Sequence, residues 1–319
     1  MTDHKLVYND SSHTYTLNGR RAKSVTAVAK IAPDSYALEQ WRKRQVAIGL
    51  MLEPRLAERI AVDPDNRELV DAICEEAMRV AGSHHKADRG TQRHRASELA
   101  DLGGTLLTAQ QKADAVAWQR TIEHHGLEIL PQHVEGFAIY PDHGVVGRFD
   151  RFARYQGRTR IVDLKSGENA VKYPQSTVVQ LALYANAPLI SATAVTAGDR
   201  STITEWTTVP EDIDLETGLI VLLSDGMEIG ELWEIDIAHG WAGAQYALSL
   251  VDWRKAYRYG DELSRRVDSG PYTDPVLLRI SQAESRSELE FVWERYAATW
   301  TQTHTTAAAN RIQQLAAAK

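Results

Sequence analysis

The chain has 319 residues, of which 43% are hydrophobic and 25% are charged. These values are ordinary for a globular protein, and the length allows one large α/β domain with an appendage or two modest domains. The formal net charge of −7 argues against a protein that binds polyanions through its overall charge.

The sequence shows no sign of a membrane or secretory protein. Its clearest apolar run, Leu219–Leu223, is only as long as a strand, so we expect no membrane span. The first residues lack the apolar core of a signal peptide. A single cysteine, Cys74, rules out an internal disulfide and suits a reducing cytoplasm. We therefore expect a cytoplasmic protein.

The N-terminal part reads as a hairpin followed by helices. Residues Tyr8–Val28 alternate in polarity around Asn18-Gly19, which is a strong type I′ turn signal. Residues 36–62 and 66–82 have helical periodicity and are separated by proline-containing breaks. We expect these helices to form a wall beside the rest of the fold.

A histidine follows these helices in the run Gly90-Thr-Gln-Arg-His94, which has Arg93 beside it. A helix that begins at Gly90 or Thr91 would place His94 in its first turn, with the side chain toward the following sheet. A neutral imidazole is a good ligand for a divalent transition-type ion. Alone, such a residue is more often a surface histidine, and both interpretations stay open on this evidence.

The central stretch, Gly147–Gly167, contains two β-runs on either side of Gln156-Gly157. A hairpin that turns symmetrically there places Asp150 directly opposite Asp163, with Cβ atoms roughly 5 Å apart. Lys165 shares the face of Asp163 because side chains alternate along a strand. Two buried carboxylates at that distance repel unless a cation is present. The alternative is a solvated hairpin face with a ladder of charges.

Basic residues are concentrated around this hairpin. Between Gly147 and Lys172 there are seven basic and three acidic residues, and Arg148 and Arg151 are among the basic ones. Together with Arg93, they are candidates for contacts to a nucleic-acid backbone, which need a local positive surface and not a basic protein. Any single one of them can equally be a solubilising surface residue.

The predicted helix after the hairpin, Tyr173–Asn186, carries Gln180 and Tyr184 four residues apart and so on one face. That face would look toward Asp163 and Lys165, where an amide and a phenol can hold a phosphate or the lysine. The alternative for Tyr184 is an ordinary core tyrosine.

The remaining sequence completes a sheet and then becomes helical. Four further strands are expected at 190–197, 202–209, 219–224 and 228–237, and helices at 239–259, 287–304 and 307–319. The fold class is α/β (α+β), with a central mixed sheet flanked by helices. We expect one domain over residues 1–237 and a helical C-terminal extension over residues 238–319.

Four motifs occur in one order: Gly90-Thr-x-x-His94, Gly147-x-x-Asp150, Asp163-x-Lys165 and Gln180-x-x-x-Tyr184. Over roughly residues 80–240 this set resembles the RecB-type branch of the PD-(D/E)XK nuclease superfamily, and the N-terminus is similar to phage-encoded nucleases of that branch. The resemblance implies a restriction-endonuclease-like core. It also makes Glu135, on the strand before Asp150, a candidate metal ligand or water-orienting group, with an exposed strand residue as the alternative.

The resemblance implies metal-assisted hydrolysis of phosphodiester bonds. His94, Asp150, Asp163 and the Leu164 carbonyl would hold Mg²⁺ or Mn²⁺, while Lys165 would orient or deprotonate a water. Gln180 and Tyr184 would act beside Lys165. Relatives in the CRISPR systems hold an iron–sulfur cluster with four cysteines, which this chain cannot do.

The function expected from the resemblance is a DNA exonuclease in phage-type recombination, replication or repair. The partner would be a duplex end or a single strand, and the location would be the host cytoplasm if the protein is phage-encoded. Two alternatives remain, a nuclease fold that has lost activity and serves DNA binding or assembly, and a restriction-type endonuclease. The C-terminal helices, with aromatic residues at helical spacing, are a candidate surface for self-association or for a recombination partner.

Overall fold

The computed structural model describes residues 4–83, 85–192, 200–256 and 274–317, and the chain divides into two compact units, Met1–Arg258 and Tyr259–Lys319. The helices of the first unit are α1 (Val25–Ala29), α2 (Tyr36–Leu52), α3 (Arg55–Val62), α4 (Arg67–Val80), α5 (His85–Asp101), α6 (Ala109–His125), α7 (Asn169–Lys172), α8 (Gln175–Ala185) and α9 (Ile237–Ala256). Its strands are β1 (Leu6–Asn9), β2 (Thr14–Leu17), β3 (Arg20–Arg21), β4 (Lys23–Ser24), β5 (Glu128–Val134), β6 (Phe137–Tyr140), β7 (Val145–Arg148), β8 (Arg151–Tyr155), β9 (Arg158–Lys165), β10 (Leu189–Ile190), β11 (Arg200–Ile203), β12 (Thr217–Leu222) and β13 (Glu231–Asp236).

The largest sheet has five strands in the order β13-β12-β9-β8-β5. β8 and β9 form its central hairpin, in which Tyr155 pairs with Arg158 and Arg151 pairs with Val162. Both turn residues have positive φ, 52° at Gln156 and 81° at Gly157, as a two-residue type I′ turn requires. The register predicted from the sequence is confirmed. On the other side of β9, β12 runs parallel to it.

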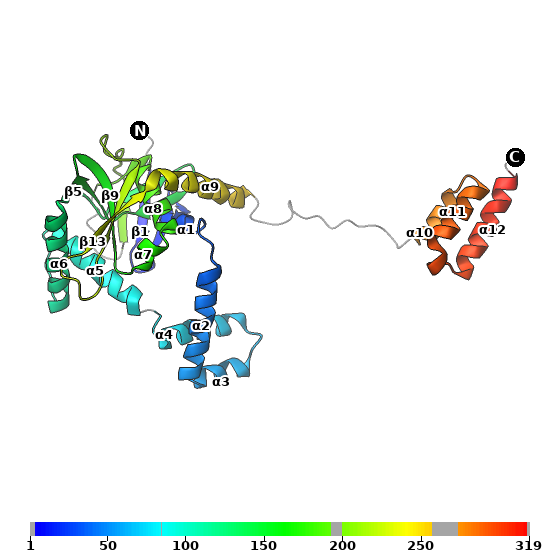
Figure 1. Ribbon diagram of the computed structural model, residues 1–319, viewed down its shortest axis with the longest axis horizontal. Coiled ribbons are helices and arrows are strands. Elements are labelled where there is room, and N and C mark those ends of the chain that lie inside the picture. Colours follow the sequence, from blue (N-terminus) through cyan, green and yellow to red (C-terminus); the bar gives the residue numbers. More distant parts are fainter. Residues whose placement is uncertain (1–3, 84, 193–199, 257–273, 318–319) are drawn as a thin grey trace. The chain divides into compact units, whose positions relative to one another are not determined.

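Helices cover both faces of this sheet (Figure 1). On one face, Phe152, Ile161 and Ile220 pack in a core cluster with residues of α8 and α9. On the opposite face, Ala153 and Val162 pack in a second cluster with Trp118 of α6. Because successive side chains of β9 point to alternate faces, Asp163 is directed to the same side as Ile161.

Two smaller sheets accompany the central mixed sheet, and the predicted fold class, a mixed sheet flanked by helices, is confirmed. The N-terminal hairpin is present, but its strands form a sheet of order β11-β1-β2-β3, and β10, β6, β7 and β4 form another. β11, expected beside the other late strands, pairs antiparallel with β1. Of the strand expected at 190–197, residues 193–197 lie outside the described residues, and only Leu189–Ile190 pairs, with β6.

α2, α3 and α4 form a helical arm at one end of the first unit (Figure 1). One face of α2 packs on α4, and Leu56, Ile73 and Ala77 form the small core of the arm. At Gly49 of α2 an added Cβ would lie 1.9 Å from the carbonyl oxygen of Ala77. Glycine is therefore required there by the close approach of two helix backbones.

The boundary between the units lies farther along the chain than residue 237. Apolar residues of α9, Ala244, Ala247 and Leu248, belong to the same core cluster as α8, so this helix is part of the first unit. The second unit contains α10 (Pro275–Gln282), α11 (Arg286–Tyr296), the short helix η2 (Ala297–Thr299) and α12 (Gln302–Ala317). The helix expected over 287–304 is interrupted after Tyr296.

No helix in the described part of the chain is both long enough and apolar enough to span a bilayer.

Replacement of Gly49 by alanine tests the packing of the arm. In an exposed helix Gly→Ala stabilises by about 0.5–1 kcal/mol, but here the clash with Ala77 should reverse the sign and destabilise by about 1–3 kcal/mol. Chemical denaturation followed by circular dichroism measures the change, with the exposed replacement Ala47→Ser as the control. A more stable Gly49→Ala variant would show that the two helices do not approach this closely.

Candidate active site

Asp150 and Asp163 meet at the open end of the β8–β9 hairpin. Asp150 directly precedes β8, and its Oδ2 accepts a hydrogen bond of 2.8 Å from the backbone N–H of Leu164. Asp163 is the next residue of β9 after Val162, which pairs with Arg151. Burial raises the pKa of Asp163, and the negative charge of Asp150 raises it further. The pairing of Arg151 with Val162 has the register from which the sequence analysis predicted Asp150 opposite Asp163.

Lys165 lies beside Asp163, with its Nζ 2.5 Å from Asp163 Oδ2. Burial lowers the pKa of Lys165, but the charges of Asp163 and Asp150 outweigh burial and raise it. Asp163 Oδ2 is buried and receives no hydrogen bond of acceptable geometry from any described residue, so the charges of Lys165 and His94 are what compensate it. A buried carboxylate oxygen in that state fits a position next to a cation.

His94 approaches the carboxylates from α5. The helix begins at His85, so His94 lies in its third turn and not in the first turn as expected. Its Nδ1 is 3.2 Å from Asp150 Oδ2. Burial lowers the pKa of His94, but the adjacent Asp150 raises it above the ordinary value. For Asp150 the two effects have opposite signs. Burial alone would raise its pKa, but the charge of His94 holds that pKa well below its usual range.

Glu135 lies in the bend between β5 and β6 and not within a strand, which corrects the expectation. Its φ is 55°, an uncommon conformation for a residue with a side chain that often marks functional sites. Its N–H donates to the Asp150 carbonyl at 2.6 Å, and its Oε2 is 2.8 Å from Arg148 Nε. Burial, opposed by Arg148 and reinforced by Asp150 and Glu98, raises the pKa of Glu135 to about 7.

Three of the predicted ligands form a compact donor set. His94, Glu135 and Asp150 each offer one ligand atom, and the three atoms lie within 4.8 Å of one another. Asp163 is outside this triple and is paired with Lys165. The Leu164 carbonyl points to the β8 side of β9 because its N–H does. An imidazole with carboxylate and carbonyl oxygens suits a divalent ion such as Mn²⁺ or Mg²⁺.

Glu98 is a member of this site that the sequence analysis missed. It is buried one helical turn after His94. Its Oε1 is 3.6 Å from Arg148 Nη2, and its charge contributes to the raised pKa of Glu135. The signal that could have identified it is the spacing of four residues from His94, which puts both side chains on one face of α5.

Tyr184 contacts the backbone, and Gln180 contacts the side chains of Tyr184 and Thr26. The Tyr184 hydroxyl donates a 2.8 Å hydrogen bond to the Arg148 carbonyl, and Gln180 Nε2 is 3.4 Å from the Tyr184 oxygen. Tyr184 is buried, and burial raises its pKa well above the ordinary value. This geometry makes Tyr184 a support of the segment before Asp150, because its proton is already used there.

The arginines predicted to contact DNA are held inside the protein. Arg151 is 0% exposed, donates to Asp101 at 2.7 Å and has its guanidinium 4.2 Å from the ring centre of Trp118. Arg93 is 3% exposed, and Arg148 is engaged with Glu135 as described. These positions do not fit direct contacts to phosphate. Each guanidinium already pairs with carboxylates of the protein or donates to a backbone carbonyl.

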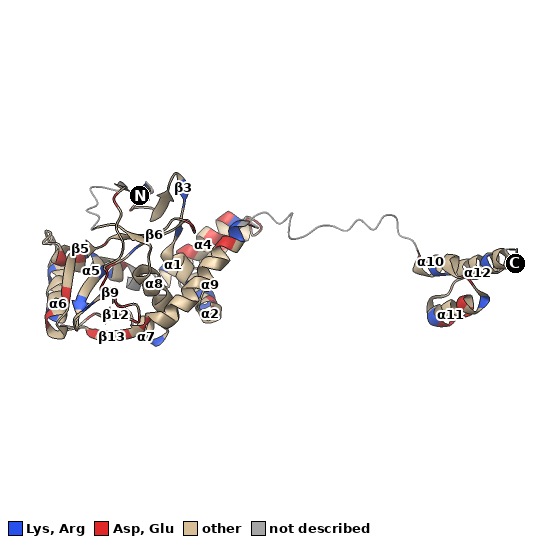
Figure 2. Cartoon of the chain, turned by 90° about the horizontal axis from the view of Figure 1, so that it is seen from above, with Lys and Arg blue, Asp and Glu red and all other residues tan. Residues whose placement is uncertain are grey.

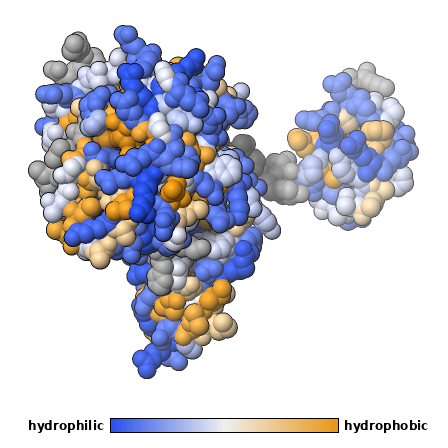
Figure 3. Space-filling view, turned by 60° about the vertical axis from the view of Figure 1, so that its left-hand side comes forward, coloured by the Kyte–Doolittle hydropathy of each residue, from blue (hydrophilic) through white to orange (hydrophobic). Residues whose placement is uncertain are grey.

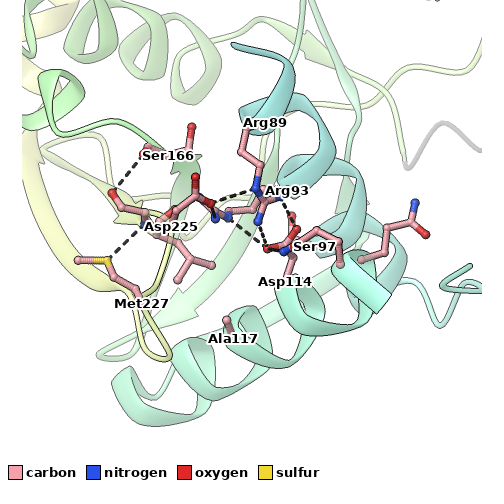
Figure 4. A network of polar contacts seen from close by, with 12 residues as sticks. Arg89, Arg93, Ser97, Asp114, Ala117, Ser166, Asp225 and Met227 are labelled. Atoms are coloured by element: carbon pink, nitrogen blue, oxygen red, sulfur yellow. Dashed lines mark hydrogen bonds and ion pairs between the residues drawn. The ribbon is translucent and has the colours of Figure 1, made fainter. Parts of the chain in front are cut away.

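Arg89 and Arg93 instead form a clasp that fixes α5 (Figure 4). Arg89 makes two hydrogen bonds to Asp114 of α6, at 2.6 and 2.5 Å. Arg93 donates to the Leu223 carbonyl and to Asp225 in the segment after β12, both at 2.5 Å. The clasp joins α5, α6 and the segment after β12, and it thereby sets where His94 lies.

Loss of the Arg151 side chain should destabilise the first unit strongly. Arg151→Ala leaves the Asp101 carboxylate buried without its ion pair, which costs about 3–5 kcal/mol. The control is Arg154→Ala on the same strand, because Arg154 is 54% exposed and 3.8 Å from its partner Asp212, a surface pair that contributes about 0–1 kcal/mol. Equal losses in urea denaturation would contradict a structural role for Arg151.

The clasp predicts an acid-sensitive contribution to stability. Burial alone would raise the pKa of Asp114, but hydrogen bonds from Arg89 and the charges of Arg89 and Arg93 hold it below its ordinary 3.8. Because the folded pKa is depressed, this stabilisation is present above pH 3.8 and is lost as the pH falls through the folded value. Asp114→Asn should make the free energy of unfolding less dependent on pH below about pH 4. An unchanged pH dependence in this range would contradict the assignment.

Acidic and basic residues are interspersed over the first unit, as they are along α6 (Figure 2). The site is therefore distinguished by its buried ionic groups and not by a surrounding field of one sign.

A search of curated proteins finds no match to this chain. Residues 37–210, more than half of the chain, match the family model described as the PD-(D/E)XK nuclease superfamily. The chain therefore belongs to the PD-(D/E)XK nuclease superfamily.

Proposed function

We propose that this protein is a Mg²⁺- or Mn²⁺-dependent DNA exonuclease of the RecB-type branch that hydrolyses phosphodiester bonds in phage-type recombination, replication or repair. Membership of the superfamily indicates a metal-dependent nuclease with DNA as its substrate. The observation that carries the proposal for this chain is the convergence of His94, Glu135 and Asp150 within 4.8 Å beside the Asp163–Lys165 pair. Five ionisable groups brought together from α5, the β5–β6 bend and the hairpin are costly to bury without a chemical role.

The chain's own residues divide the work in this proposal. His94, Glu135 and Asp150, with Asp163 and the Leu164 carbonyl at the same strand end, would hold the divalent ion. When bound, the ion supplies charge that polarises the scissile phosphate and lowers the pKa of water. Lys165, held as an ammonium group by Asp163, would orient the attacking water and offset negative charge in the transition state.

The remaining site residues act as supports. Arg148 holds Glu135 and Glu98, and Tyr184 holds the Arg148 carbonyl. Gln180 adjoins Tyr184 and is only partly buried, so it is the member of this pair that could reach a phosphate. Partner docking through the C-terminal helices also belongs to the proposal, supported by the exposed side chains of Phe291 and Trp293.

Digestion of end-labelled DNA tests the proposal. Wild-type protein should degrade linear duplex or single-stranded DNA when Mg²⁺ or Mn²⁺ is added, and not in a chelator. Asp163→Ala and Lys165→Ala should each lower the rate at least about 100-fold, because the ligand or the transition-state charge is lost. Glu128→Ala, an exposed carboxylate on β5 of the same sheet, is the matched control.

The same assay separates the alternatives. If wild type and Asp163→Ala are equally inactive while both bind DNA, the protein is an inactive nuclease fold that serves binding. An exonuclease requires a terminus, so linear DNA with blocked ends and closed circular DNA should resist it. Cleavage of the circular substrate would instead identify a restriction-type endonuclease.

A further inference from the structure

The outer face of α2 carries an apolar stripe that no other described residue of the first unit covers. Leu38, Trp41, Ile48 and Leu52 are 46%, 37%, 39% and 59% exposed. The neighbouring face of the helix, with Val46, Gly49 and Leu50, packs on α4. Figure 3 shows apolar side chains gathered on the arm, which extends below the rest of the first unit in that view. An exposed stripe is unusual, because the outward face of a helix in a globular protein is normally polar.

The spacing of the stripe is that of a coiled-coil seam. Leu38, Trp41, Gln45, Ile48 and Leu52 follow one another at intervals of three, four, three and four residues. These are the positions a and d of a heptad repeat, which bring knobs of one helix against a second helix. Four of these five positions are apolar, with Gln45 in the middle, and together they extend over roughly 21 Å at 1.5 Å per residue. Scattered exposed apolar residues need no explanation, but four at this spacing do.

Three consecutive basic residues accompany the seam. Arg42, Lys43 and Arg44 are exposed, and none of them forms an ion pair with another described residue. Arg42 and Arg44 occupy the heptad positions e and g, which flank a and d and interact with charges of a partner helix. The seam therefore has unpaired positive charge on both of its sides.

This charge argues against a second copy of the chain as the occupant. The basic triplet lies near the middle of the seam, so two copies would bring their triplets together in either a parallel or an antiparallel pair. The helix also offers only about two heptads, fewer than the three or four that mark a coiled coil of its own. Duplex DNA is a poor fit as well, because four large apolar side chains would be placed against phosphates.

We propose that the outer face of α2 docks an amphipathic helix of a partner protein whose flanking positions are acidic. Apolar residues of the partner would cover Leu38, Trp41, Ile48 and Leu52, and its carboxylates would pair with Arg42 and Arg44. The contact is small compared with the 1,200–2,000 Å² or so of a stable interface, so the complex is reversible. The inference rests on the arm alone and is independent of the nuclease site.

Two designed 21-residue peptides serve as probes, and they share leucine at a and isoleucine at d. One carries glutamate at e and g, and the other carries lysine there, so like charges keep each peptide from pairing with itself. Fluorescence anisotropy of the labelled peptides is measured against the full-length protein. The acidic peptide should bind at least about tenfold more tightly than the basic one, a difference of roughly 1.4 kcal/mol.

Variants on the exposed face should change binding without changing the fold. Ile48→Ser should weaken the acidic peptide about tenfold, whereas Val116→Ser, at an exposed apolar residue of α6, should leave it unchanged. The double replacement Arg42→Glu and Arg44→Glu should reverse the preference in favour of the basic peptide. A reversal of this kind cannot arise from misfolding, and circular dichroism with Mg²⁺-dependent digestion checks each variant.

Three results would overturn the proposal. One is equal binding of the two peptides, or no binding of either up to about 1 mM. Another is a concentration-dependent mass in analytical ultracentrifugation that Ile48→Ser abolishes, which would make the seam a contact between copies. The third is a loss of duplex DNA affinity in the arginine variant without any change in peptide binding, which would make it a nucleic-acid surface.

Discussion

The two-residue turn at Gln156-Gly157 is the constraint on which the site depends. Both residues adopt positive φ, and this turn sets the pairing of β8 with β9. Because the side-chain period of a strand is two, a slip of one residue would send Asp163 and Lys165 to the opposite face. The chemistry at the far end of the hairpin is thus fixed by backbone geometry at its tip, six residues from Asp163.

Burial of charge is organised around this hairpin in two ways. At the open end, carboxylates, His94 and Lys165 lie together with incomplete compensation, and Asp163 Oδ2 lacks a hydrogen bond from the described residues. Beside it, Arg151 donates to the Asp101 carboxylate and Arg93 donates to the Leu223 carbonyl, although the Nε of each arginine has no hydrogen-bond partner among the described residues. These arginines hold the elements in place, and the open end of the hairpin is where a cation is expected to act.

The sequence predicted the parts of the fold that depend on local signals. The turn, its register, the helix that carries Gln180 and Tyr184, and the separation of the arm helices at proline all follow from residue types and spacing. The division into three sheets did not, because the pairing of β11 with β1 joins segments nearly 200 residues apart in the chain. Glu135 was placed on a strand because nothing in its neighbours indicates its left-handed conformation.

The candidate site was predictable to the extent that its motifs are local. Asp150, Asp163 and Lys165 were predicted to share one face from the hairpin register and the alternation of side chains, whereas His94 was added from the resemblance of its motif. The roles of Arg93, Arg148 and Arg151 were not predictable, because an arginine is a surface cation or a buried anchor according to its tertiary partners. Asp101 and Asp225, which bind Arg151 and Arg93, are 50 and 132 positions away in sequence. Glu98 was missed although its spacing of four residues from His94 is a local signal.

The central claim is that these side chains converge on one divalent ion. Titration of the full-length protein with Mn²⁺ by isothermal calorimetry tests it most directly, with Asp150→Asn as the variant because an amide oxygen can still accept the Leu164 N–H. Glu128→Gln is the control for a lost surface carboxylate. Binding that is at least about tenfold weaker in Asp150→Asn alone is the predicted result. Equal Mn²⁺ affinity in all three proteins would contradict the account.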